Sequence, residues 1–115
     1  MEAIMPGQDD VPEGGWVRVA ALSELPAGAM MCVEPAGEPI AIYHLEDGTY
    51  CATDAICSHQ YALLTDGLLE HDMVECPLHA AQFNVRNGKV LCEPAERDLK
   101  TYEVRAEDAD IFLKL

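Results

Sequence analysis

Two short segments, each holding one cysteine and one histidine, constrain this chain more than any other feature. The first is Cys57-Ser58-His59, and the second, after an interval of sixteen residues, is Cys76-Pro77-Leu78-His79. Turn residues and short β-like runs surround both segments, so each offers one thiol and one imidazole from a loop between strands. Thiolate and imidazole are common metal ligands. The pattern therefore predicts a fold that brings two loops together at one metal centre.

The spacing inside the first segment narrows the kind of centre. Cys-x-His is one residue shorter than the Cys-x2-Cys spacing typical of structural zinc. It suits a centre in which the cysteine and the histidine of one loop bind different ions. A [2Fe–2S] cluster of the Rieske type meets this requirement, since cysteines bind one of its irons and histidines the other. The predicted ligands are Cys57 and Cys76 on one iron, and His59 and His79 on the other.

Two other interpretations of these four residues are open at this point. A mononuclear zinc ion bound by two cysteines and two histidines would make the chain a structural or interaction module. A coincidence of buried cysteines and surface histidines would give no metal site at all. Colour separates the two metal hypotheses, because a [2Fe–2S] protein is red-brown and a zinc protein is colourless.

The remaining cysteines and histidines lie outside this pattern. Cys32, Cys51 and Cys92 occur among strand-like residues, where a cysteine is by default a small buried apolar side chain. His44, on a presumed strand, and His71, in a polar turn, are expected to be solvated or locally hydrogen-bonded. The sequence offers no dinucleotide-binding fingerprint and no second set of iron ligands. We therefore predict an electron carrier and not an enzyme.

Short apolar runs separated by turn residues predict an all-β fold. The expected strands are 16–20, 29–33, 40–45, 49–52, 73–75, 82–85, 89–91, 99–105 and 111–115. Glu46-Asp47-Gly48 is a hairpin signal, and Asn87-Gly88 predicts a two-residue turn. No window sustains the apolar spacing of an amphipathic helix, so helix is limited to a turn or two near 23–25. Residues 1–15 are predicted to be a flexible tail, and 16–115 one domain.

The charge of the chain excludes several classes of partner. It has 21 acidic and seven basic residues, a formal net charge of −14, and Arg18 as the single basic residue among the first sixty. Such a surface repels nucleic-acid backbones and anionic lipids, so neither is an expected partner. The longest apolar stretches reach five or six residues, far short of the ~20 of a membrane helix. With no secretory signal at its start, the chain is expected to be cytoplasmic.

From Trp16 to Leu115 the chain also resembles the Rieske-type ferredoxins of bacterial aromatic-ring-hydroxylating dioxygenase systems. The likeness lies in the two ligand segments and in residues 15–20, 25–28, 52–54, 64–67 and 83–88. The resemblance implies a β-sandwich or barrel base carrying a small cluster-binding β subdomain, roughly residues 51–90. It also implies a proline-containing loop over the cluster at 93–95.

The same resemblance implies a function. The chain is expected to carry single electrons through one [2Fe–2S] cluster. The electrons would come from a flavin-dependent NAD(P)H reductase and pass to a terminal Rieske non-haem iron oxygenase. They are expected to enter and leave on the side of His59 and His79.

Several positions differ from those of related proteins. The family often has glycine after each ligand histidine, where this chain has Gln60 and Ala80, and glycine tolerates a positive φ better than either. High-potential respiratory Rieske proteins have disulfide cysteines at the positions of Ala62 and Leu78, and serine and tyrosine hydroxyls at those of Ala81 and Phe83. Fewer hydrogen bonds to sulfur favour the oxidised state. The resemblance thus implies a potential near the low end of the Rieske range, ~−150 mV.

Overall fold

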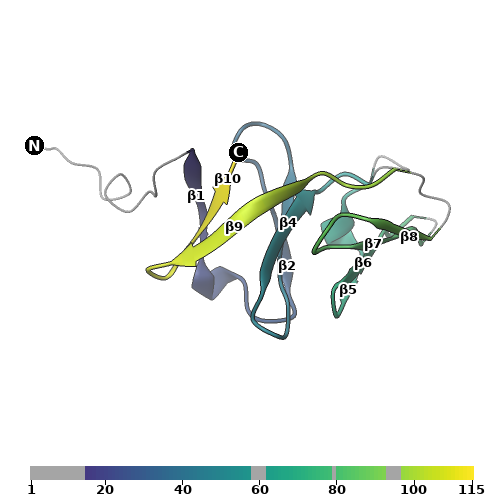
Figure 1. The fold of residues 1–115 in the computed structure, drawn as a ribbon, viewed down its shortest axis with the longest axis horizontal. Helices are drawn as coiled ribbons and strands as arrows, with labels where there is room; N and C mark the ends of the chain where they lie inside the picture. The colour runs from purple at the N-terminus through teal and green to yellow at the C-terminus, as the bar shows by residue number, and fades with distance from the viewer. Residues whose placement is uncertain (1–14, 58–61, 79, 93–96) are drawn as a thin grey trace, which may run out of the picture.

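The structure, a computed structural model, describes residues 15–57, 62–78, 80–92 and 97–115. The predicted tail (Gly15 apart), both predicted histidine ligands and the predicted loop at 93–95 lie outside these ranges. Two antiparallel sheets lie side by side and account for most of the described chain (Figure 1). The predicted all-β class is therefore confirmed. No helix of the described residues is long and apolar enough to cross a membrane.

The nine predicted strands are all present, with ends displaced by at most two residues. In chain order the elements are β1 (Trp16–Ala21), η1 (Leu22–Glu24), β2 (Met30–Val33), β3 (Ile40–His44), β4 (Tyr50–Asp54), η2 (Leu64–Asp66), β5 (Leu68–Glu70), β6 (Met73–Glu75), β7 (Gln82–Asn84), β8 (Val90–Cys92), β9 (Thr101–Glu107) and β10 (Asp110–Lys114). The short 3-10 helix η1 matches the predicted helical turn. Strand β5 and η2 were not predicted, because three-residue elements without β-branched or aromatic runs leave little periodic signal.

The larger sheet has six strands in the order β1-β10-β9-β4-β3-β2. Strand β3 lies between β4 and the edge strand β2, and its alternation sends Ile40 and Ile42 to one apolar cluster and Ala41 and Tyr43 to another. Because both faces of β3 are covered, its side chains are almost wholly buried. The sheet therefore contributes to two cores, one of its own and one shared with the smaller sheet.

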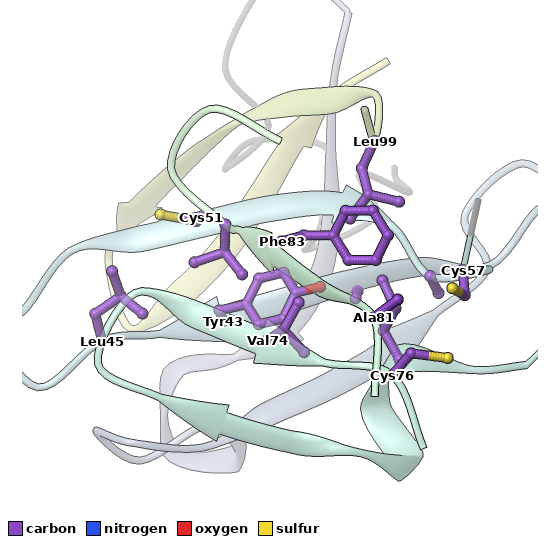
Figure 2. Packing of buried hydrophobic residues seen from close by; sticks show 13 residues of the cluster. Tyr43, Leu45, Cys51, Cys57, Val74, Cys76, Ala81, Phe83 and Leu99 are labelled. Atoms are coloured by element: carbon purple, nitrogen blue, oxygen red, sulfur yellow. The ribbon is translucent and has the colours of Figure 1, made fainter. Parts of the chain in front are cut away.

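The smaller sheet is a meander of four short antiparallel strands, in the order β5-β6-β7-β8. Its inward row runs across the strands through Leu69, Val74, Phe83 and Val90, each paired with the next. All four belong to or pack against the apolar cluster that contains Tyr43 from β3 of the larger sheet, and Figure 2 shows Val74 and Phe83 beside Tyr43. The shared apolar cluster thus fixes the smaller sheet against the larger one.

The turn at Asn87-Gly88 is longer than predicted. The connection between β7 and β8 covers residues 85–89, and the Gly88 N–H donates to the Asn84 carbonyl at 2.7 Å. Gly88 has φ +76°, and a Cβ there would collide with the carbonyl oxygen of Leu99. The Leu99 N–H donates to the Gly88 carbonyl at 2.7 Å, so the turn is shaped by the returning chain and not by the hairpin alone.

Candidate metal centre

The two ligand segments form loops of the same construction. The Cys57 N–H donates to the Ala62 carbonyl at 2.9 Å, and the Cys76 N–H donates to the Ala81 carbonyl at 2.7 Å. Paired residues flank both loops: a bridge joins Ile56 to Leu63, and Glu75 pairs with Gln82. Each loop therefore begins at a cysteine and is closed by that cysteine's own backbone five residues later. A backbone bond of this kind holds the sulfur-bearing residue rigidly, which a metal ligand requires.

The two cysteines lie together at one end of the shared core. Cys57 is 4% exposed and Cys76 is 1% exposed, both within one apolar cluster. Figure 2 shows their sulfurs at the same end of this cluster, with Leu45 and Cys51 at the other. Both are free thiols, and their side chains hydrogen-bond with each other. The fold thus brings together two residues that are nineteen positions apart, as the spacing predicted.

The two predicted histidine ligands, His59 and His79, lie outside the described residues. Among the residues that are described, no group of three potential metal ligands comes together. The assignment of the four-residue ligand set therefore stays a prediction. The part that the structure describes, a facing pair of buried thiols on two matched loops, fits a two-cysteine iron site.

Its surroundings keep the Cys76 thiol protonated while no metal ion is bound. Burial raises the pKa of its thiol above the ordinary value, the neighbouring Cys57 raises it further, and a hydrogen bond from the Leu78 backbone N–H lowers it. A thiol in such a place ionises when a metal ion supplies the compensating charge. The Leu78 N–H then remains as a donor to the ligand sulfur, a contact of the kind that tunes iron–sulfur centres.

Gly67 brings β5 close to the second loop. A Cβ at this position would collide with the Glu75 carbonyl oxygen and would lie 3.1 Å from Cδ of Pro77. The Gly67 N–H donates to the Leu64 carbonyl at 2.9 Å, which closes η2. Residues 64–67, part of the family likeness, are therefore explained by a close approach between backbones. Sequence reasoning recognised the segment but not the carbonyl that requires the glycine.

Ala80, one of the departures from the family pattern, keeps a backbone conformation suited to glycine. Its φ is 58°, in the left-handed region. An alanine there costs roughly 1–2 kcal/mol, since its Cβ crowds the following carbonyl. The second loop therefore retains the shape that glycine would favour despite the substitution.

The core beside the cysteines offers no hydroxyl from Ala81 or Phe83, both of which are fully buried. The buried hydroxyls nearby are those of Tyr43 and Thr53, which hydrogen-bond to each other at 2.8 Å. The Thr53 hydroxyl also donates to the Asp54 carbonyl at 2.9 Å. Sequence analysis did not single out this pair, although alternation on the adjacent strands β3 and β4 places both residues on one face.

Of the residues predicted to have no metal role, His44, His71 and Cys51 have the expected surroundings, whereas Cys32 is less buried than expected. His44 contacts the Leu25 carbonyl through Nδ1 at 2.8 Å and stacks on Tyr50 with ring centroids 4.1 Å apart. His71 is exposed in the turn between β5 and β6. Cys51 is buried, whereas Cys32 is only half-buried at the outer strand β2. The side chain of Cys92 lies outside the described parts of the structure.

At the end of the smaller sheet away from the cysteines, Arg86 joins three turns. Its guanidinium donates to Asp47 at 2.6 Å, to Asp72 at 3.2 Å and to the Thr49 hydroxyl at 3.4 Å. These partners belong to the β3–β4 and β5–β6 turns. The Thr49 N–H and, after it, Arg86 lower the pKa of Asp47 to about 2. No local pattern predicts this cluster, because its members come together only in the folded chain.

The family model of the Rieske [2Fe-2S] domain matches residues 15–103. The chain belongs to the Rieske family. It is 42% identical over 100 residues to the ferredoxin component of the naphthalene 1,2-dioxygenase/salicylate 5-hydroxylase systems of Ralstonia sp, covering 87% of this chain and 95% of that protein. It is 45% identical over 96 residues to the 3-phenylpropionate/cinnamic acid dioxygenase ferredoxin subunit of Photorhabdus laumondii, covering 83% and 90%.

Solved structures show the same likeness. A complex of reduced oxygenase and oxidised ferredoxin in carbazole 1,9a-dioxygenase contains a chain that matches with a TM-score of 0.81 and 30% identity, over 89% of this chain and 94% of that one. The ferredoxin of Sphingomonas yanoikuyae B1 matches with a TM-score of 0.80 and 29% identity, over 86% and 97%. The Rieske-type base with a smaller cluster-binding part is therefore confirmed.

These comparisons decide between the hypotheses raised by the sequence. A Rieske domain holds one [2Fe–2S] cluster, so the predicted cofactor is confirmed and the zinc module is not supported. The relatives are ferredoxin components of multicomponent systems, so the predicted role of an electron carrier is also confirmed.

Proposed function

We propose that Cys57 and Cys76 bind one iron of the Rieske cluster and that His59 and His79 bind the other. The observation that carries the assignment is the pair of matched loops, each closed by the backbone of its cysteine, with both sulfurs in one buried cluster. The cluster supplies one-electron transfer when bound. The chain's residues supply two thiolates, a Leu78 N–H donor and an apolar wall. The cluster-binding part is proposed to span roughly residues 51–90.

We further propose that this ferredoxin takes electrons from a flavin-dependent NAD(P)H reductase and delivers them to a terminal ring-hydroxylating oxygenase. The names of its relatives support this role, since they are components of dioxygenase systems. The carbazole dioxygenase complex supports the oxygenase as the acceptor. The proposal of a reductase as the electron donor is supported only by the names of these systems. A cytoplasmic location is part of the same proposal.

Reconstitution tests the function directly. The protein as isolated is mixed with NADH, a flavin-dependent ferredoxin reductase and a terminal ring-hydroxylating oxygenase. Bleaching of the Rieske absorption on addition of the reductase, followed by substrate-dependent reoxidation with the oxygenase, is the expected result. A ferredoxin that is reduced but never reoxidised by any ring-hydroxylating oxygenase would contradict the proposed acceptor.

A further inference from the structure

A groove of about 500 Å³ lies beside the two cysteine loops. Its apolar wall consists of Ile56, Ala62, Leu63, Pro77 and Leu78. Ile56 precedes Cys57 directly, and Leu78 follows Cys76 by two residues, so both loops contribute to the groove. Leu78 is 45% exposed, which leaves a large apolar side chain open to solvent beside the core. An open apolar wall at this place is typical of a surface that a partner covers.

Two carboxylates, Glu34 and Asp66, also line the groove. Glu34 follows β2, Asp66 ends η2, and these two elements lie against each other. Both residues are exposed, and no basic residue among the described ones lines the groove. Burial raises the pKa of the nearby Cys32 thiol, and these two carboxylates raise it further. The groove therefore combines an apolar floor with a concentrated negative charge.

The other large hollows differ in charge. One lies along β4 and β9, the other lies between the β3–β4 and β5–β6 turns, and both contain the guanidinium of Arg86. In both, Arg86 lies beside acidic residues and is ion-paired with Asp47 and Asp72. The hollow beside the loops differs from these two, because its described lining combines a mainly apolar wall with two acidic residues and no basic one.

Resting on the proposed function, we propose that this groove receives a long cationic side chain, lysine or arginine, from the surface of the terminal oxygenase. Both side chains have an apolar stem and a charged head. The stem would lie on Leu63 and Leu78, while the head would reach Glu34 and Asp66. Because residues from both cysteine loops line the groove, a side chain bound there would hold the oxygenase in one position relative to the cluster. A net charge of −14 favours the approach of such a basic surface.

The test compares groove variants with matched controls. Glu34→Gln/Asp66→Asn removes two charges at the groove, and Glu103→Gln/Asp108→Asn removes two exposed charges on β9 and its turn. Leu78→Ala removes the apolar wall, and Leu68→Ala truncates a leucine that is 53% exposed elsewhere. Each variant is first checked for iron content and visible spectrum. Kd is then measured by calorimetry against the oxygenase that the wild-type protein reduces, at low and high salt.

The groove variants are expected to raise Kd, about tenfold for the charge pair and about fivefold for Leu78→Ala, while both controls stay within about twofold. The charge pair should also flatten the salt dependence of Kd. Equal effects of the two charge pairs would mean diffuse attraction and would overturn the groove. So would unchanged binding by Leu78→Ala. Because the wild-type protein must reduce the same oxygenase first, failure of the proposed function would appear before any variant is compared.

Discussion

The two ends of the smaller sheet are held together by different forces. At one end, Cys57 and Cys76 are buried, and the loops that carry them are closed by backbone hydrogen bonds. At the other end, Arg86 ties exposed turns together through ion pairs with Asp47 and Asp72. By the proposed assignment, a metal completes the first arrangement, whereas the second depends on charged side chains and therefore on pH. The site and its support can therefore be perturbed separately.

The largest effect is expected from removal of a ligand sulfur. Cys57→Ser or Cys76→Ser should lose the [2Fe–2S] cluster, because a hydroxyl replaces a thiolate in a buried two-cysteine pair. Iron and acid-labile sulfide, each two per chain in the wild type by this assignment, measure the loss. Cys32→Ser is the control and should keep the cluster. The opposite outcome, with Cys32 essential and Cys76 dispensable, would show that the ligands are misassigned.

A side chain at Gly67 should distort the loop that carries Cys76 without replacing a proposed ligand. Gly67→Ala places a Cβ against the Glu75 carbonyl and should destabilise the protein by roughly 1–3 kcal/mol. It should also alter the visible spectrum, because the second loop must shift. Gly37→Ala is the control: its φ of +86° costs about 1 kcal/mol, but its surroundings are open. Urea unfolding and the spectrum of each variant test the prediction, and an altered spectrum for Gly37→Ala would count against it.

A hydroxyl placed beside the sulfurs should raise the reduction potential. Ala81→Ser adds a donor at a fully buried position next to Cys76. A hydrogen bond worth about 1 kcal/mol more to the reduced state corresponds to roughly 40 mV. Redox titration measures the shift. Ala52→Ser, buried in the other apolar cluster, serves as the control, and an equal shift in both variants would refute a local effect.

Removal of the backbone strain at Ala80 should increase the stability of the protein by a small amount. Ala80→Gly removes a Cβ from a residue with φ 58° and should stabilise the protein by roughly 0.5–1 kcal/mol after the entropy of glycine is subtracted. Ala27→Gly, in an exposed turn, should destabilise instead. Thermal unfolding of the two variants with intact clusters decides the sign, and loss of stability by Ala80→Gly would contradict the strain argument.

The smallest effect on stability is expected from Asp47, in the Arg86 cluster at the end of the smaller sheet away from the cysteines, and this effect depends on pH. The pKa of Asp47 is lowered to about 2, mainly by the Thr49 N–H and Arg86. A lowered pKa in the folded state adds stability above the ordinary pKa near 4, and this stability disappears as pH falls towards 2. Asp47→Asn should therefore lower the urea midpoint slightly at pH 5, and the difference from wild type should shrink at pH 3. A difference that grew on acidification would have the wrong sign for this pair.

Local patterns in the sequence predict the strands, turns and cysteine loops better than they predict the long-range contacts that hold these elements in place. The apolar run at 40–43 and the hairpin signal at 46–48 depend on neighbouring residues, so both appear in the sequence. The spacing of Cys57 and Cys76 likewise reports two similar loops. The approach of Gly67 to a carbonyl and the contacts of Arg86 join segments far apart in the chain. They exist only after folding, so no local pattern can indicate them.

The place where the chain leaves and re-enters the larger sheet has a consequence for assembly. Ala52 and Thr53 of β4 pair with Tyr102 and Thr101 of β9, so the segment from 54 to 100 starts and ends at adjacent points. Leaving that segment as an open loop, in place of a tight turn, costs the larger sheet only roughly 2 kcal/mol of closure entropy. The pairing of β4 with β9 is thus expected to tolerate a long insertion at this point, which is where the chain carries its cysteine loops.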